Sequence, residues 1–413
     1  AKHINPIDGK VFQTNPRKLF TATPTRTQFP RGFLWDEGFH QLLISNWDIE
    51  ISLDILSHWF QSMDESGWIA REQILGPEAE EAVPDQFIPQ NPDHANPPTL
   101  FIALEQIMNA KSFTSVDLMG NQQLDEHTLV KKFLKKHYSL LKRHYNWYRQ
   151  TQKGTIPFTF QWRGRLENHT LSSGLDDYPR GTQYPQTTER HLDLYCWMYW
   201  LTNIMHQIAE VVDNPKDATM YSEVASTLKK QLKKYHFSAK MKWYADFVSS
   251  EEGEGFHKTS DGYSLHIGYV SLFPLIADMI EYESKDMDMV LNIIKSKSHI
   301  WSPFGLRSLA KKDPKYGADE NYWRGSIWIN LNYLVCRALY RAKESMDNSS
   351  QRREKVVTIY NNLRSNLINN MVRVYKKRKS LFEQYDGNSG KEKGAYPFTG
   401  WSALIVKIIM EEY

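Results

Sequence analysis

Apolar residues recur at intervals of three and four along most of this chain, and that spacing limits the folds open to it. Leu43, Trp47, Ile51, Ile55 and Trp59 follow one another every four residues, which places them on one face of an α-helix. The stretch predicts a single helix that ends near residue 63. The same kind of pattern predicts further helices at 99–111, 127–151, 188–212, 216–235, 264–282, 285–296, 326–344, 350–373 and 400–411.

Long loops rich in Trp, Tyr, Pro and Gly separate these helices, at 153–187, 240–263, 300–325 and 380–399. A further irregular stretch with many prolines covers 67–98, and a loop of that length inside a compact domain usually has a function. Strand-like alternation is scarce, and only 155–162 and 242–248 suggest short hairpin pieces. The repeated order of helix, turn, helix and long loop predicts a mainly α fold. We expect an α/α toroid over 31–413, with aromatic and acidic loops at one end, behind a lead-in segment at 1–30.

Composition excludes several classes of protein. The chain has 413 residues, of which 41% are hydrophobic, so it can bury a large core and is not a disordered protein. A net charge of +3 is too small to argue for nucleic acid as a partner. No run of about 18 apolar residues occurs, so we expect no membrane contact by this chain. Two cysteines, Cys196 and Cys336, exclude a disulfide framework, and Cys196 is expected to be a buried thiol.

Two adjacent carboxylates, Asp176 and Asp177, stand in a loop rich in Ser, Gly and Pro. Like charges this close raise each other's pKa when they are desolvated, which is one way to keep a carboxylic acid protonated near neutral pH. A helix start follows, with Thr188 as its N-cap and with Glu189 and Asp193 four residues apart on one face. Four carboxylates at such a junction fit either a binding site or a solvated corner.

Other loops also combine aromatic rings with carboxylates and guanidinium groups, which suits a neutral polyhydroxylated ligand. Sugar C–H faces stack on aromatic rings, and sugar hydroxyls bond to carboxylates and arginines. The tryptophans fit a core role as well, and the arginines fit salt bridges that tie loops together. The candidate sugar contacts are Phe33, Trp35, Asp36, Arg71, Glu72, Asp177, Glu189, Asp193, Trp323, Arg324, Tyr385 and Trp401.

Cleavage of a glycosidic bond needs two carboxyl groups, one protonated and one ionised. Asp176 fits the acid, because Asp177 and nearby aromatic rings are placed to raise its pKa. Glu383 fits the base, because its loop contains few other acids. No metal-binding spacing and no phosphate-binding glycine loop occurs in the sequence, so we predict neither a metal nor a cofactor.

Several long segments of the chain resemble one family of glycosidases. The segments are FPRGFLWDEGFH (29–40), GWIAREQ (67–73), SGLDDYPR (173–180), ERHLDLYCW (189–197), WSPFGLR (301–307) and YWRG (322–325). They are similar to those of the eukaryotic processing α-glucosidases I, the mannosyl-oligosaccharide glucosidases of glycoside hydrolase family 63. The resemblance covers the chain from about residue 16 to the C-terminus.

The resemblance implies an (α/α)6 barrel and hydrolysis with inversion at the anomeric carbon. It implies removal of the outermost α-1,2-linked glucose from the triglucosylated N-glycan precursor, in the lumen of the endoplasmic reticulum. Asp176 then matches the family's general acid and Glu383 its general base. Residues 189–197 match its oligosaccharide-binding motif, with Tyr195 where animal members usually have arginine.

The family's membrane anchor and N-terminal β-sandwich domain have no counterpart in this sequence, so we expect an isolated catalytic domain. Two sequons, at Asn168 and Asn348, are compatible with a secretory compartment. Two alternatives stay open. One is another inverting toroid hydrolase, such as a trehalase or a bacterial α-glycosidase, and the other is a glycan-binding module without catalytic activity.

Overall fold

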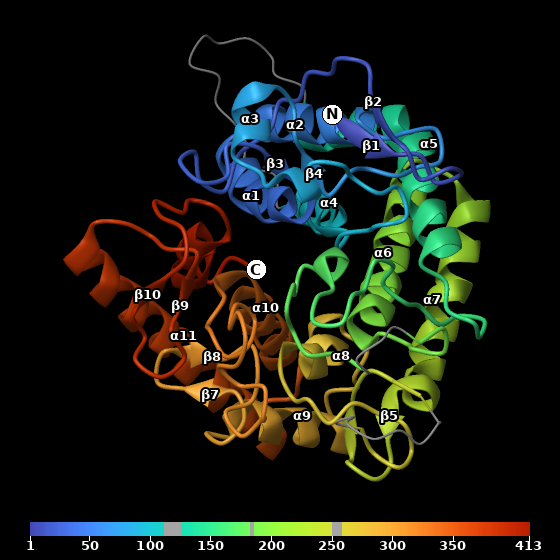
Figure 1. Cartoon of the computed structure of the whole chain (residues 1–413). Helices are drawn as coiled ribbons and strands as arrows, with labels where there is room; N and C mark the ends of the chain where they lie inside the picture. Colours follow the sequence, from blue (N-terminus) through green and yellow to red (C-terminus); the bar gives the residue numbers. More distant parts are fainter. Residues whose placement is uncertain (111–124, 182–185, 250–257) are drawn as a thin grey trace. The chain divides into compact units, whose positions relative to one another are not determined.

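The computed structural model describes residues 1–110, 125–181, 186–249 and 258–413 of the chain. These residues are mainly helical and contain twelve α-helices (Figure 1). The helices are α1 (Leu34–Trp47), α2 (Ile49–Gln61), α3 (Pro77–Glu81), α4 (Thr99–Asn109), α5 (Glu126–Thr151), α6 (Leu192–Val211), α7 (Pro215–His236), α8 (Phe273–Ile276), α9 (Lys285–Lys295), α10 (Ile329–Ser345), α11 (Gln351–Arg378) and α12 (Ile405–Met410).

The strands are short and pair only two at a time, as antiparallel ladders, in the described residues. They are β1 (Lys2–Ile4) with β2 (Val11–Gln13), β3 (Gly32–Phe33) with β4 (Glu72–Gln73), β5 (Phe237–Ser238) with β6 (Trp243–Tyr244), β7 (Trp301–Ser302) with β8 (Gly305–Leu306), and β9 (Gln384–Tyr385) with β10 (Glu392–Lys393). The hairpin predicted at 155–162 reduces to one bridge between Lys153 and Phe160. That predicted at 242–248 contains β6.

The helix predicted to end near residue 63 is in fact two helices, α1 and α2. Asp48 interrupts the pattern with an extended backbone, and its side chain accepts a hydrogen bond of 3.0 Å from the amide of Ile51. An aspartate that caps a new helix in this way competes with continuation of the preceding one. Trp47, which the four-residue spacing assigned to the buried face, is consequently 79% exposed.

Two further helix predictions need correction. Residues 264–282 contain only the 3₁₀ turn Tyr269–Leu272 and the short helix α8, which ends before Asp278 at a positive φ of 60°. Helix α6 begins at Leu192, so Thr188 is not its N-cap. The backbone of Arg190 instead pairs with that of Phe247 through two hydrogen bonds of 2.9 and 3.0 Å, which keeps the approach to α6 extended. The predictions at 99–111, 127–151, 216–235, 285–296, 326–344 and 350–373 correspond to α4, α5, α7, α9, α10 and α11.

Backbone contacts divide the chain into two compact units, each built from separate stretches of sequence. The first unit comprises 1–23, 30–151 and 199–227, and the second comprises 24–29, 152–198 and 228–413. Helices α6 and α7 contribute residues to both units.

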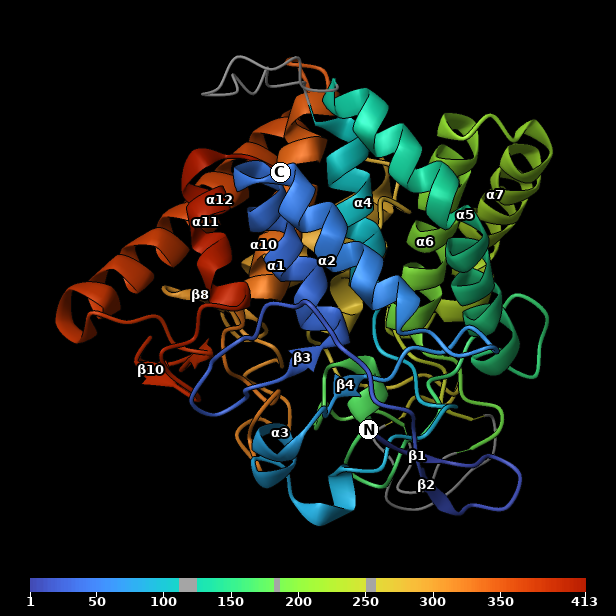
Figure 2. The ribbon, with the colours of Figure 1, turned by 90° about the horizontal axis from the view of Figure 1, so that it is seen from above.

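In the first unit, α1 packs against both α2 and α4 (Figure 2). The approach of α1 to α4 requires glycine at position 38, because a Cβ atom there would lie 2.3 Å from the backbone and the side chain of Thr99. Leu56, Trp59, Phe60 and Phe101 fill the core between these helices with almost no exposed surface. None of the helices in the described residues is long and apolar enough to cross a bilayer.

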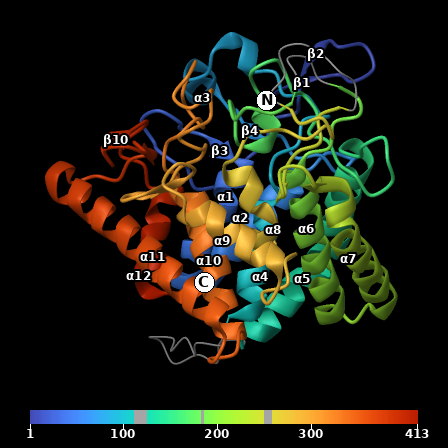
Figure 3. The same ribbon diagram turned by 90° about the horizontal axis from the view of Figure 1, so that it is seen from below.

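In the second unit, α10 packs against α8, α11 and α12, and α9 packs against α11 (Figure 3). Part of the lead-in segment belongs to this unit, because the carbonyl of Pro24 accepts hydrogen bonds of 3.0 and 3.2 Å from the amides of Thr399 and Gly400. Cys196 and Cys336 are both buried and form no disulfide, which confirms the expectation for Cys196.

Candidate active site

Asp176, the predicted acid, lies in the second unit on an irregular loop that we call the acid loop, residues 163–180. The loop folds back on itself through the 3₁₀ turn Leu171–Ser173, and the amide of Thr170 donates a hydrogen bond of 2.7 Å to the carbonyl of Asp176. Gly174 closes the turn at a φ of +74°, a conformation that favours glycine. Asp176 is half-buried, whereas its neighbours on both sides are buried.

Asp177 points its carboxylate into the protein, where the segment Tyr322–Arg324 meets it. Its two oxygens accept hydrogen bonds from the amides of Tyr322 (3.0 Å) and Trp323 (2.5 Å). Its carbonyl accepts another from Nε of Arg324 at 2.7 Å, and the same Nε lies 3.6 Å from the carboxylate. The side chain is thus occupied by protein donors, so the geometry gives Asp177 the task of fixing a neighbouring loop.

Glu383, the predicted base, stands directly before β9, and its side chain contacts the two residues that follow β10. Its Oε2 accepts a hydrogen bond of 3.0 Å from the amide of Ala395. Oε1 accepts a short hydrogen bond from the hydroxyl of Tyr322. Gly394 leaves room for the carboxylate, since a Cβ atom at that position would lie 2.2 Å from Oε2.

The electrostatics of Glu383 follow from this environment. Only 3% of the residue is exposed, and burial raises the pKa of the carboxyl above its ordinary value, although the hydrogen bonds from Tyr322 and Ala395 act in the opposite direction. Such a carboxylate is a stronger base than one at the surface. Tyr322 was not among the candidates from sequence, although it belongs to the YWRG segment that carried part of the resemblance.

The remaining aromatic candidates of the second unit surround Glu383 and Asp177 as buried support. Trp323 stacks on Trp328 with ring centroids 3.8 Å apart, and only 1% of it is exposed. The indole of Trp401 donates a hydrogen bond of 3.0 Å to the carbonyl of Glu383. Tyr385 is fully buried, and its backbone pairs with that of Ile327. These aromatic residues therefore hold the backbone of the site.

The guanidinium group of Arg324 has protein partners on two sides. Besides its bonds to Asp177, its Nη1 makes an ion pair with Asp319. The side chain ties the turn at 319–324 to the acid loop, which is the loop-bridging role that the sequence left open for the arginines.

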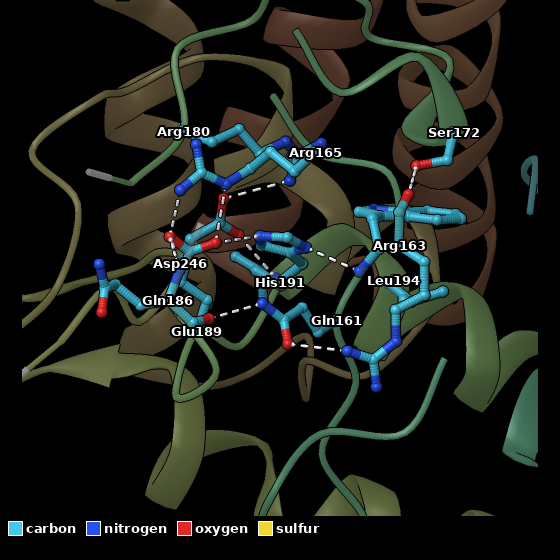
Figure 4. A network of polar contacts seen from close by, with 12 residues as sticks. Gln161, Arg163, Arg165, Ser172, Arg180, Gln186, Glu189, His191, Leu194 and Asp246 are labelled. Carbon is cyan, nitrogen blue, oxygen red and sulfur yellow. Dashed lines mark hydrogen bonds and ion pairs between the residues drawn. The ribbon is translucent and has the colours of Figure 1, made fainter. Parts of the chain in front are cut away.

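Glu189 and Asp193 lie in a buried polar network together with residues of the acid loop. Figure 4 shows Glu189 in this network, with Arg165 and Arg180. Arg165 grips Glu189 with two nitrogens, Nε at 2.8 Å from Oε2 and Nη2 on Oε1. Arg180 also makes a bidentate contact, with Nη1 and Nη2 on the two oxygens of Asp193, and its Nη1 reaches Oδ2 of Asp246 at 3.1 Å. The solvated-corner interpretation is wrong for these two carboxylates, because they face arginines rather than solvent.

The network contains two further hydrogen bonds that fix its orientation. Nδ1 of His191 accepts the amide of Trp162 at 2.9 Å, so its Nε2 is directed at Glu189, 3.4 Å away. The indole of Trp162 donates to Asp193 at 3.0 Å. Burial disfavours the charged forms, but His191 and Arg165 outweigh it and lower the pKa of Glu189. Arg180 likewise outweighs burial at Asp193 and lowers the pKa of that carboxyl.

The candidates of the first unit gather where β3 pairs with β4. Phe33 lies opposite Glu72 in this ladder, and the guanidinium of Arg31 lies 4.7 Å above its ring. Glu72 accepts Nε of Arg31 at 2.8 Å and Nη2 of Arg71 at 2.5 Å. The structure thus brings Phe33, Arg71 and Glu72 together, with Arg31, which was not among the candidates, between them. Trp35 and Asp36, in the first turn of α1, are both buried.

Within the described residues, no group of three or more histidine, cysteine or acidic side chains is arranged to hold a metal ion. The candidate site consists of carboxylates, arginines and aromatic rings. Such an arrangement can perform acid–base chemistry on a neutral polar substrate.

A glycosidase family matches almost the whole chain. The model of the glycosyl hydrolase family 63 C-terminal domain matches residues 3–412. The chain belongs to this family.

Two relatives named as mannosyl-oligosaccharide glucosidases are similar to nearly the whole of this chain. A probable mannosyl-oligosaccharide glucosidase from Schizosaccharomyces pombe is 37% identical over 98% of this chain and 53% of its own length. A mannosyl-oligosaccharide glucosidase from Arabidopsis thaliana is 40% identical over 96% of this chain and 50% of its own. The chain thus spans about half the length of the curated relatives it matches.

Solved structures share the fold at low sequence identity. The mannosylglycerate hydrolase of family 63 from Thermus thermophilus, crystallised with glucose, superposes with a TM-score of 0.68 at 14% identity over 95% of this chain and 96% of that chain. A neutral trehalase from Saccharomyces cerevisiae gives a TM-score of 0.58 at 12% identity over 100% of this chain and 76% of its own.

Proposed function

We propose that this chain is the catalytic domain of an inverting exo-α-glucosidase that removes the terminal α-1,2-linked glucose from the triglucosylated N-glycan precursor. The observation that carries the proposal is the identity of 37% and 40%, over almost the whole chain, to proteins named mannosyl-oligosaccharide glucosidase. We propose further that residues 31–413 fold as an (α/α)6 barrel, behind the lead-in segment at 1–30. Its place of action would be the lumen of the endoplasmic reticulum.

Asp176 is the proposed general acid and Glu383 the proposed general base. Asp176 protonates the glycosidic oxygen as the bond to the anomeric carbon breaks. Glu383 accepts a proton from a water molecule, whose oxygen forms the new bond on the opposite face of the sugar. Inversion requires the two carboxyl groups to lie about 6.5–9.5 Å apart, which leaves room for that water. The raised pKa of Glu383 supports its assignment as base, because a base works best when its pKa lies closer to the operating pH.

The sugar contacts are proposed with a division of roles. Phe33, Trp35, Asp36 and Arg71 are the proposed contacts from the first unit. In the second unit, the buried residues Asp177, Trp323, Tyr385 and Trp401 support the catalytic pair. Tyr322, which is half-buried and bonded to Glu383, joins the proposed site.

The decisive experiment follows the anomer of the released sugar. The chain is incubated with a triglucosylated oligosaccharide, and proton NMR is recorded before the product mutarotates. Initial release of β-glucose supports the proposal, and initial α-glucose contradicts inversion. Asp176→Asn should reduce turnover by about 10²–10⁴-fold while binding of the oligosaccharide persists.

Two controls separate this function from the alternatives. Faster cleavage of trehalose than of the triglucosylated glycan would favour a trehalase-like enzyme, as the fold shared with a trehalase allows. Binding without any hydrolysis by the unmodified chain would favour a glycan-binding module.

A further inference from the structure

Two arginines flank Asp176 along the acid loop, one near each end. Arg165 lies close to the start of the loop and Arg180 is its last residue. Their partners, Glu189 and Asp193, lie four residues apart where the chain enters α6. The loop is therefore fastened at both ends to one short piece of backbone.

We propose that Arg165 and Arg180 are positioning residues for Asp176, with Glu189 and Asp193 as their anchors. Residues 189–197 would then act on the reaction through the acid loop, and not by contact with sugar. This inference rests on the proposed function, because it takes Asp176 as the acid. It also departs from the role that the resemblance gave to residues 189–197.

Burial argues against direct sugar contact by the anchors. The side chains of Glu189 and Asp193 are 1% and 0% exposed, and those of Arg165 and Arg180 are 3% and 1% exposed. A sugar hydroxyl could therefore displace an arginine from its anchor only if the loop opened.

The hydrogen-bonding capacity of the anchors is also used within the protein. Each oxygen of Glu189 accepts a nitrogen of Arg165, and each oxygen of Asp193 accepts a nitrogen of Arg180. The indole of Trp162 also donates to Asp193, and Nε2 of His191 lies 3.4 Å from Oε2 of Glu189.

The segment at the start of α6, which carries the anchors, is itself held in place. The arginines therefore fix the ends of the acid loop to a fixed segment. Asp246 accepts the amide of Leu192, the first residue of α6, at 2.7 Å, and it also pairs with Arg180. One aspartate thus connects the end of the acid loop to the start of the helix. A buried ion pair adds little net stability, because desolvation offsets much of the attraction, but its bidentate geometry is specific. Lysine cannot reproduce the planar fork of arginine.

The acid loop is also braced by hydrogen bonds within itself. Ser172 donates from its hydroxyl to the carbonyl of Arg163 at 2.7 Å, and the amide of Thr170 bonds to the carbonyl of Asp176. A shift at either end of the loop is therefore carried to the backbone of the acid.

The test compares two substrates that differ in their need for a proton. An oligosaccharide ending in Glc-α-1,2-Glc has a poor leaving group and requires the acid, whereas α-glucosyl fluoride releases fluoride with little protonation. Because a misplacement of about 1 Å costs roughly 100-fold, Arg165→Lys and Arg180→Lys should lower kcat on the oligosaccharide by about that factor. On the fluoride the loss should stay below roughly fivefold, with KM for both substrates unchanged within about threefold.

Two results would overturn the inference. Equal losses of kcat on both substrates would indicate general damage to the site. A rise in KM on both substrates with unchanged kcat would indicate that residues 189–197 bind sugar directly. Glu189→Gln, which keeps the shape of the anchor and removes its charge, replaces any lysine variant that does not fold, as judged by circular dichroism.

Arg352→Lys is the control, because Arg352 on α11 grips Asp288 on α9 through Nε and Nη2, at 3.1 and 2.7 Å, the same two nitrogens that Arg165 uses on Glu189. It should leave kcat unchanged on both substrates. If it lowers the two rates in the pattern expected for Arg180→Lys, the effect is not specific to the acid loop and the inference fails.

A second readout does not depend on turnover. Hydrogen exchange of the Thr170 and Ser173 amides should be at least about tenfold faster in Arg180→Lys than in the unmodified chain, because the bonds that protect them lie within the loop. Unchanged exchange contradicts the inference even if the unmodified chain is inactive. An inactive unmodified chain with faster exchange in the variant would instead contradict only the proposed function.

Discussion

Replacement of Tyr322 by phenylalanine tests the environment of the proposed base most directly. The hydroxyl of Tyr322 donates a hydrogen bond to Oε1 of Glu383, and the amide of Ala395 serves the other oxygen. Tyr322→Phe removes one of these two donors and leaves the ring, with its edge-on contact to Trp328, in place. Burial already raises the pKa of Glu383, so the loss of a donor to the charged form raises that pKa further.

The magnitude follows from the strength of the bond that is lost. A hydrogen bond to a charged group contributes about 1.5–3 kcal/mol. Because Tyr322 is only half-buried, water can replace part of the interaction, and we take the lower end, about 1.5 kcal/mol. Since a pKa unit corresponds to about 1.36 kcal/mol, the pKa of Glu383 should rise by roughly one unit.

The assay is the pH dependence of kcat/KM on an oligosaccharide ending in Glc-α-1,2-Glc. Glu383 must be ionised to act as base, so the acidic limb of the profile should move to higher pH by about one unit, with a roughly tenfold loss on that limb. Tyr282→Phe is the control, because the hydroxyl of Tyr282 donates a hydrogen bond of 2.6 Å to Asp278, and neither residue belongs to the proposed site. An acidic limb that stays in place, or moves to lower pH, would refute the reasoning.

Three further predictions concern the buried network and the sequons. Asp193→Asn should lower the free energy of unfolding by about 3–5 kcal/mol in urea denaturation, because Arg180 is left with too little compensating charge; a loss below about 1 kcal/mol would contradict a buried pair. The pKa of Glu189 lies below its ordinary 4.5, so its contribution to stability is present above that pH and declines as pH falls through the lowered pKa. Glu189→Gln should therefore weaken the loss of stability on acidification, and an unchanged pH profile of unfolding would argue against this. Asn168 and Asn348 are exposed, so expression through a secretory pathway should attach glycans that N-glycosidase removes, and Asn→Gln at both positions should abolish the shift in mobility.

Sequence periodicity located most of the long helices but not the break between α1 and α2. The four-residue repeat continues across Asp48, and the repeat records only which residues are apolar. An aspartate is at once a polar residue on a helix surface and a good N-cap. The backbone conformation in the structure shows that Asp48 is an N-cap, and Trp47 before it is therefore exposed.

The candidate site was predictable in its residue types and less so in its contacts. Tyr322 bonds to Glu383 across 61 positions, and Arg180 bonds to Asp246 across 66. Neither pair follows from a single sequence, because tertiary packing alone brings such distant residues together. The sequence did contain one local signal, since Arg180 ends the SGLDDYPR segment and lies only 13 positions before its partner Asp193.

The adjacent carboxylates of the acid loop acquire different meanings once their partners are known. The sequence suggested that the charge of Asp177 acts on Asp176, yet that charge faces two amides and Arg324. The hydrogen bonds of Asp177 also connect the acid loop to the proposed base. Asp177 holds the amide of Tyr322, and the hydroxyl of the same tyrosine holds Glu383.

One residue therefore joins the neighbour of the proposed acid to the proposed base. The separation of two carboxyl groups decides between inversion and retention, and the two ranges differ by only a few ångströms. A pair carried on independent loops would vary in separation as each loop moved. A pair tied through Tyr322 moves together, while Arg165 and Arg180 fasten the acid loop to its anchors. The loss of Tyr322 should then disturb the base, whereas the loss of either arginine should disturb the acid, and the two kinds of variant should differ in their response to the leaving group.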